Sequence, residues 1–137
     1  MTNLIGIIVA CLVQIESGGN PSALGDYKDG EPRAVGILQQ WECSVLEANR
    51  IDAIYARREG REARFWTLTD RLDPDKSRAM AEITLTYHRD RGITNAVDLA
   101  CRWHCPFRAE CHEVYRGKVR RVLDRLQKHN TTREDGR

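Results

Sequence analysis

Residues 4–17 have the sequence LIGIIVACLVQIES, and the turn-forming stretch GGNP follows them directly. Apolar residues occur on nearly every side of this segment, which is typical of a helix buried in the middle of a domain. Thr2 or Asn3 can cap its first turn, and Gly18 with Gly19 predicts its end. The sequence therefore predicts a buried N-terminal helix around which the rest of the chain packs.

The remaining chain divides into one long loop and several helices. Gly, Asn, Pro and Asp occur throughout residues 18–33, which predicts the loop. Asp73 followed by Pro74 predicts a helix start, because it combines an N-cap with proline at the first helical position. Helices are expected over residues 42–50, from residue 74 onward, after the cap Thr94, and over residues 109–128. Residues 53–64 have a weaker helical pattern. The predicted fold class is mainly α, with at most a small β-hairpin in or beside residues 18–40.

Length and composition indicate one ordinary globular domain. The chain has 137 residues, of which 41% are hydrophobic and 31% charged, and this balance excludes the class of disordered proteins. We expect one folded domain over residues 1–128 and a flexible polar tail over residues 129–137. The net charge is only +2, but residues 101–137 alone carry +5. Such a segment suits an anionic polymer such as cell wall or nucleic acid, or it is simply a solvated helix face.

The apolar run at residues 4–13 could pass for the core of a signal peptide. No Lys or Arg precedes it, and the run is too short to span a bilayer. We therefore expect no signal peptide and no membrane insertion, and synthesis in the cytoplasm.

Glu16 continues the apolar stripe formed by Val9 and Leu12, so its carboxyl is expected at the edge of the core. It also lies at the C-terminal end of the helix, where the macrodipole disfavours a second negative charge. Partial burial acts in the same direction. These effects favour a carboxyl that keeps its proton near neutral pH, as a general acid must. A solvated glutamate at a helix end is the ordinary alternative.

The residues around Glu16 resemble a known family. ESGGNP at residues 16–21 and AVGILQ at residues 34–39 are similar to the signature of soluble lytic transglycosylases and goose-type lysozymes. In that signature an E-S pair closes a core helix, an N-P-x-A loop follows, and G-[IL]-[LM]-Q comes next. The similarity extends to residues 45–51, to residues 72–80 and to the final helix. It thus covers roughly residues 4–126.

This resemblance implies a lysozyme-like domain that cleaves the β-1,4 bond between N-acetylmuramic acid and N-acetylglucosamine in peptidoglycan. Glu16 would be the general acid that protonates the glycosidic oxygen. Gln39 would project into the cleft, Gly36 would let the backbone approach the sugar chain, and Ser17 would line the same cleft. No cofactor or metal is implied, and the partner would be a glycan strand bound by a monomer.

Two mechanisms can follow that protonation. A lytic transglycosylase needs one acid, because the C6 hydroxyl of the sugar then attacks and leaves a 1,6-anhydro end. An inverting hydrolase needs a second carboxylate that positions a water molecule. Asp29 is the nearest counterpart of the aspartate in goose-type lysozymes, with Asp26 as the other choice, although loop acids can merely solvate a turn. Trp41 stands where those lysozymes carry a further aspartate, which favours the transglycosylase.

The sequence departs from the family pattern at residues 101–112, CRWHCPFRAECH. His104 stands where the family has Asn, and Trp103 stands where transglycosylases often have a tyrosine that holds the acid. Tyr87 could supply that hydroxyl instead, while Trp103 stacks on a sugar or packs in the core. The three cysteines and two histidines of this stretch could form a Cys₃His zinc site, a Cys105–Cys111 disulfide, or free thiols.

These departures leave two other functions open. The domain could be an inactive wall-binding module on the same fold, or a nucleic-acid binder that uses its basic final helix. That helix lacks interleaved aromatic residues, so nucleic acid is not the expected partner. A small lytic domain of this kind suits a phage lysis or virion-associated protein, or a bacterial protein with specialised export.

Overall fold

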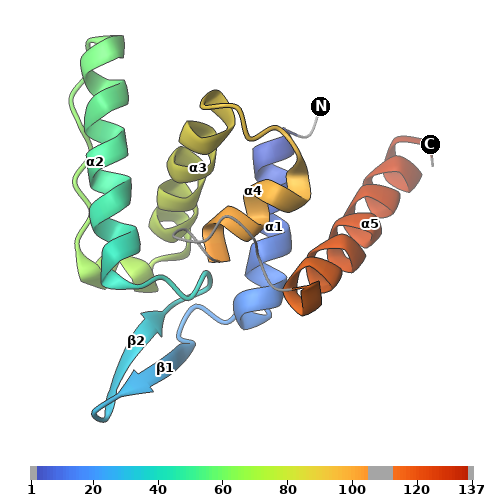
Figure 1. Ribbon diagram of the computed structural model, residues 1–137, viewed down its shortest axis with the longest axis horizontal. Helices are drawn as coiled ribbons and strands as arrows, with labels where there is room; N and C mark the ends of the chain where they lie inside the picture. Colours follow the sequence, from blue (N-terminus) through green and yellow to red (C-terminus); the bar gives the residue numbers. More distant parts are fainter. Residues whose placement is uncertain (1–2, 105–112, 136–137) are drawn as a thin grey trace.

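The computed structural model describes residues 3–104 and 113–135. Figure 1 shows that the described chain is an assembly of helices with a β-hairpin at one end. The helices are α1 (Leu4–Ser17), α2 (Glu42–Glu59), α3 (Pro74–Asp90), α4 (Ala96–His104) and α5 (Glu113–Asp135), with a short 3₁₀ helix η1 (Leu68–Leu72). Strands β1 (Leu24–Lys28) and β2 (Glu31–Val35) pair antiparallel. The predicted mainly α fold with a small β-hairpin is confirmed.

Helix α1 forms the centre of the larger hydrophobic core. It contacts α3, α4 and α5, and Figure 1 shows it between α3 and α5. Ile8 and Leu12 of α1 are fully buried in one apolar cluster that also contains Leu85, Leu99 and Val119 from those three helices. Burial of this much apolar surface is the main force that holds the helices together. The predicted buried N-terminal helix is therefore present.

The ends of α1 follow the sequence signals closely. The side chain of Asn3 accepts a hydrogen bond from the backbone N–H of Ile5, so Asn3 is the N-cap. Gly18 ends the helix in the left-handed conformation, with φ of 65°. A residue without a Cβ adopts this conformation at little cost. Glu16 is therefore fixed in the last turn of the central helix.

Helix α2 lies outside α3 and is longer than predicted (Figure 1). It runs to Glu59 because its second half also has a partly buried face, which includes Ile51 and Asp52. Asp52 is fully buried, and its carboxylate accepts hydrogen bonds from Arg61 and Arg64 on the chain that turns back after the helix. Charged partners make the burial of a carboxylate tolerable.

Two further boundaries correct the predictions. Asn95, not Thr94, caps α4, since its side chain accepts hydrogen bonds from the N–H groups of Val97 and Asp98. Helix α5 continues to Asp135, past the expected end at residue 128, because residues 129–135 contain neither glycine nor proline. Among the described residues, no helix is both long enough and apolar enough to cross a membrane.

Candidate active site

Glu16 is held by a residue from the other end of the chain. Its side chain is half-buried, and its Oε1 atom accepts a hydrogen bond of 2.9 Å from the hydroxyl of Tyr115 on α5. Tyr115 itself is only 8% exposed and belongs to the main core. Packing of α5 against α1 therefore fixes the position of one carboxyl oxygen of Glu16.

Tyr115 is the hydrogen-bond donor of this pair, because its phenol has a raised pKa. Burial raises the pKa of its phenol, and the negative charge of Glu16 with the hydrogen bond between them raises it further. An ionised phenol would have no proton to donate and would repel the carboxylate. The hydroxyl thus stays protonated and keeps the carboxyl of Glu16 in one orientation.

The tyrosine expected at this position was Tyr87, and that prediction is wrong. Tyr87 lies in the last turn of α3, and Figure 1 shows this end of α3 near the start of α1, whereas Glu16 lies in the last turn of α1. The guanidinium groups of Arg50 and Arg91 lie 5.6 and 5.2 Å from the centre of its ring. The resemblance noted for the final helix includes Tyr115 in the segment YRGKV at residues 115–119, and this was the sequence signal for the residue that contacts Glu16.

Ser17 joins the end of α1 to the turn that follows the hairpin. Its hydroxyl donates to the backbone oxygen of Ile37 at 2.8 Å and also contacts that of Val13 at 3.3 Å. The same oxygen accepts a hydrogen bond from the N–H of Gly19 at 3.1 Å. Ser17 was expected to bind substrate. In the structure its hydrogen bonds hold the loop that follows Glu16.

Position 36 requires a glycine because another backbone segment of the same chain passes close to it. Its φ is 86°, and a Cβ atom at this position would overlap the backbone oxygen of Arg71 in η1. The N–H of Gly36 donates to the backbone oxygen of Ala23 at 2.8 Å. The backbone that approaches Gly36 belongs to η1, and this contact alone requires the glycine. A role of Gly36 toward a sugar chain stays a prediction.

Gln39 has an internal role as well. Its side-chain Nε2 donates to the backbone oxygens of Ala23 at 3.0 Å and Gly36 at 3.1 Å. Its side-chain oxygen lies against Gly25, where a Cβ atom would collide with it. The amide predicted to project into a cleft therefore ties the base of the hairpin to the turn at residues 36–39.

Asp29 is explained by the turn of the hairpin. Lys28 pairs with Glu31, and Asp29 and Gly30 link them with φ values of 53° and 80°. Positive φ at both residues is the requirement of a type I′ turn, in which Asp-Gly is a preferred pair. Figure 1 shows the hairpin tip pointing away from the helices. The structure does not bring Asp29 next to Glu16, contrary to the prediction of a second catalytic carboxyl.

Asp26 belongs to a small polar and aromatic cluster on the hairpin. Its carboxylate accepts a hydrogen bond from the indole N–H of Trp41 at 3.3 Å. The guanidinium of Arg33 lies 4.4 Å from the centre of the Trp41 ring and donates to the backbone oxygen of Asp26 at 3.0 Å. These contacts give Asp26 partners within the hairpin region.

Trp103 lies at the edge of the core. It is half-buried and packs against the main apolar cluster, in agreement with the core alternative for this residue. Cys11 and Cys101 are both buried, and burial raises the pKa of the Cys11 thiol to about 11, so this thiol is unreactive near neutral pH.

The zinc and disulfide hypotheses concern residues that are not described. Cys105, Cys111 and His112 lie outside the described residues, as does the side chain of His104, the last residue of α4. Within residues 3–104 and 113–135, no three His, Cys, Asp or Glu side chains gather closely enough to hold a metal ion.

The site thus consists of one half-buried carboxyl, the hydroxyl that orients it, and a neighbouring loop that is held by several hydrogen bonds. This arrangement fixes the position of a carboxyl group, and general acid catalysis needs a side chain positioned within hydrogen-bond reach of the reacting atom. Comparison of the chain with protein-family models, with curated proteins and with solved structures finds no match.

Proposed function

We propose that this protein cleaves the β-1,4 bond between N-acetylmuramic acid and N-acetylglucosamine as a peptidoglycan lytic transglycosylase. The observation that supports this most is the half-buried Glu16 at the end of the central helix, oriented by Tyr115. The similarity of residues 16–21 and 34–39 to the signature of that family supplies the substrate class. No cofactor is required, and the expected partner is a glycan strand bound by one copy of the chain.

In this mechanism Glu16 first donates its proton to the glycosidic oxygen, and the bond to C1 of N-acetylmuramic acid breaks with oxocarbenium character. The resulting carboxylate then takes the proton of the C6 hydroxyl of the same sugar. The C6 oxygen attacks C1 and closes a 1,6-anhydro ring. Glu16 recovers its proton in this step, so the cycle consumes no water and needs no second carboxylate.

The local structure of the hairpin favours this mechanism over hydrolysis. An inverting hydrolase would need a second carboxylate roughly 6.5–9.5 Å from the first, with room for water between them. Asp29 is at the tip of the hairpin, and the carboxylate of Asp26 accepts a hydrogen bond from Trp41. A water-using reaction with Asp29 or Asp26 is therefore the second choice.

One observation favours a different function on the same fold. The side chains of Ser17 and Gln39 donate hydrogen bonds to backbone oxygens of the protein itself. A wall-binding module without catalysis would tolerate this arrangement, whereas an enzyme must bind its glycan through other side chains. Catalytic activity must therefore be measured separately from wall binding.

The proposal is tested by clearing of purified bacterial cell walls, monitored as turbidity. Wild type should clear the suspension, and Glu16→Gln should lose activity by about a hundredfold or more, because the amide cannot supply the proton. The matched control is Glu82→Gln, which makes the same change at an exposed glutamate on α3. Equal clearing by wild type and Glu16→Gln would refute the role of Glu16. Wall binding by wild type without clearing would favour the inactive module.

A further inference from the structure

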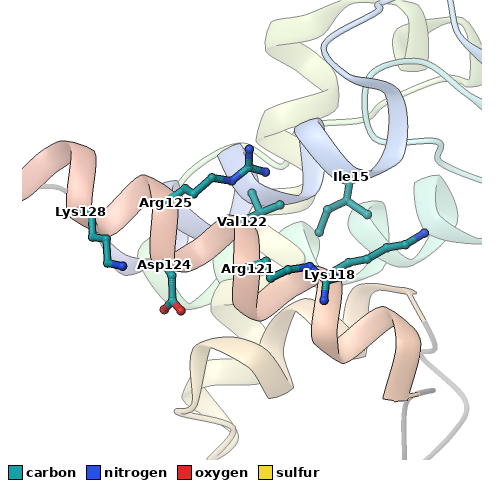
Figure 2. Close-up of a pocket in the computed structure, with 7 residues that line it drawn as sticks. All are labelled: Ile15, Lys118, Arg121, Val122, Asp124, Arg125 and Lys128. Carbon is teal, nitrogen blue, oxygen red and sulfur yellow. The ribbon is translucent and has the colours of Figure 1, made fainter.

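A hollow of about 530 Å³ lies between α1 and α5, and Figure 2 shows the side chains that line it. Ile15 of α1 faces Val122 of α5, with the side chains of Lys118 and Arg125 on either side of the pair. The complete lining consists of Ile15, Lys118, Arg121, Val122, Asp124, Arg125 and Lys128. The hollow therefore has an aliphatic floor and a strongly basic border.

The basic residues follow one face of α5. They occupy positions 118, 121, 125 and 128, and this 3-4-3 spacing keeps side chains on the same side of a helix. The stripe extends over about 15 Å along the helix axis. Within the described part of the chain, Lys118, Arg121 and Arg125 make no ion pair, although other arginines of α5 do. These three cations are therefore available to an anionic ligand.

The hollow is lined by residues close in sequence to Glu16 and to its partner Tyr115. Ile15 precedes Glu16 directly, and Lys118 lies one helical turn after Tyr115, whose hydroxyl bonds to Glu16. A ligand bound at Glu16 could therefore extend along the basic face of α5. The end of the stripe at Lys118 is the end closest to the site.

We propose that this hollow binds the peptide that is attached to the glycan strand of peptidoglycan, an inference that rests on the proposed function. The wall peptide carries several carboxylates, the methyl groups of alanine and the ammonium of a diamino acid. Arg121 and Arg125 match the carboxylates, Ile15 and Val122 match the methyl groups, and Asp124 matches the ammonium. The enzyme would then act on peptide-bearing strands in preference to bare glycan.

The carboxylate in the hollow argues against nucleic acid and other phosphate polymers. Asp124 would face a backbone that carries a negative charge at every repeat and no positive charge, and like charges repel. Electrostatic binding of nucleic acid relies on surfaces rich in Lys and Arg. A peptide of mixed charge satisfies the basic, acidic and aliphatic side chains that line the hollow.

The test uses NMR titration at low salt to measure binding of the soluble peptide alanyl-isoglutamyl-lysyl-alanine to the full chain. The double variant Arg121→Glu with Arg125→Glu should weaken binding roughly tenfold or more, since two charge-assisted contacts become repulsive. The milder pair Arg121→Gln with Arg125→Gln should weaken binding less. Arg120→Glu is the matched control, because Arg120 is an exposed residue of α5 outside the hollow lining.

Unchanged peptide binding in both double variants would overturn the inference, as would equal loss in Arg120→Glu. Tighter binding of a DNA duplex or of polyphosphate than of the peptide would overturn it in favour of a phosphate ligand. The readout is independent of catalysis. Peptide binding that depends on Arg121 and Arg125, in a protein that fails to clear cell walls, would support the hollow and refute the proposed function.

Discussion

Replacement of Gly36 by alanine tests how the loop beside Glu16 is held. Two features of the structure oppose the added methyl group. Gly36 has φ of 86°, and its Cβ would overlap the backbone oxygen of Arg71. That oxygen belongs to the short helix η1, so it cannot move as freely as the end of a flexible side chain. The loop, η1 or both must shift to admit the methyl group.

The expected loss of stability is the sum of two contributions. Left-handed backbone costs a residue with a Cβ about 1–2 kcal/mol relative to glycine. Overpacking against surrounding atoms adds about 1–3 kcal/mol. Gly36→Ala should therefore lower the free energy of unfolding by about 2–5 kcal/mol. Gly30→Ala is the matched control, since Gly30 has φ of 80° and no neighbouring atom within 4 Å of the added Cβ.

The assay is equilibrium unfolding in urea, with circular dichroism as the probe and all three proteins measured together. Gly30→Ala should lose only the backbone contribution, about 1–2 kcal/mol. The difference between the two variants then reports the collision with Arg71 alone. Equal losses in the two variants would refute the close packing of the turn against η1, and with it the reason given for the glycine.

Two other predictions follow from the hydrogen bonds. Tyr115→Phe should lower kcat roughly tenfold with little change in KM, because the ring still packs while Glu16 loses its orienting hydroxyl; a change confined to KM would contradict this positioning role. Burial alone raises the pKa of Asp52, but hydrogen bonds from Arg61 and Arg64 lower it to about 2. Its ionised form therefore contributes about 2 kcal/mol of stability above about pH 5, which is lost as the pH falls toward 2. Asp52→Asn should make the free energy of unfolding depend less on pH over this range, as measured by unfolding at a series of acidic pH values.

The local elements were predictable where the sequence contains strong signals. Asn3 and Gly18 mark the ends of α1, and Asp73 with Pro74 marks the start of α3, because caps act within a few residues. That α2 is one continuous helix ending at Glu59 was not predictable in the same way. Its second half depends on Asp52 and on the chain that returns after Gly60, and these contacts connect segments that no short pattern contains.

The candidate site shows the same division. Glu16 was identified from its place at the end of an apolar helix, which is a local property. Its partner Tyr115 lies 99 positions away, so the pairing depends on how α5 packs against α1. Gln39 and Gly36 fit the family signature, yet their contacts with Ala23 and Arg71 explain both residues without a ligand. A sequence pattern does not distinguish residues that build a loop from residues that bind substrate.

The most direct test of the central claim is mass spectrometry of the muropeptides released from cell walls by the wild-type protein. A single acid at Glu16 that both donates and recovers the proton predicts products with 1,6-anhydro ends, lighter by one water molecule than products with reducing ends. Products with reducing ends, together with their loss in Asp26→Asn or Asp29→Asn, would contradict the account and show that a second carboxylate activates water.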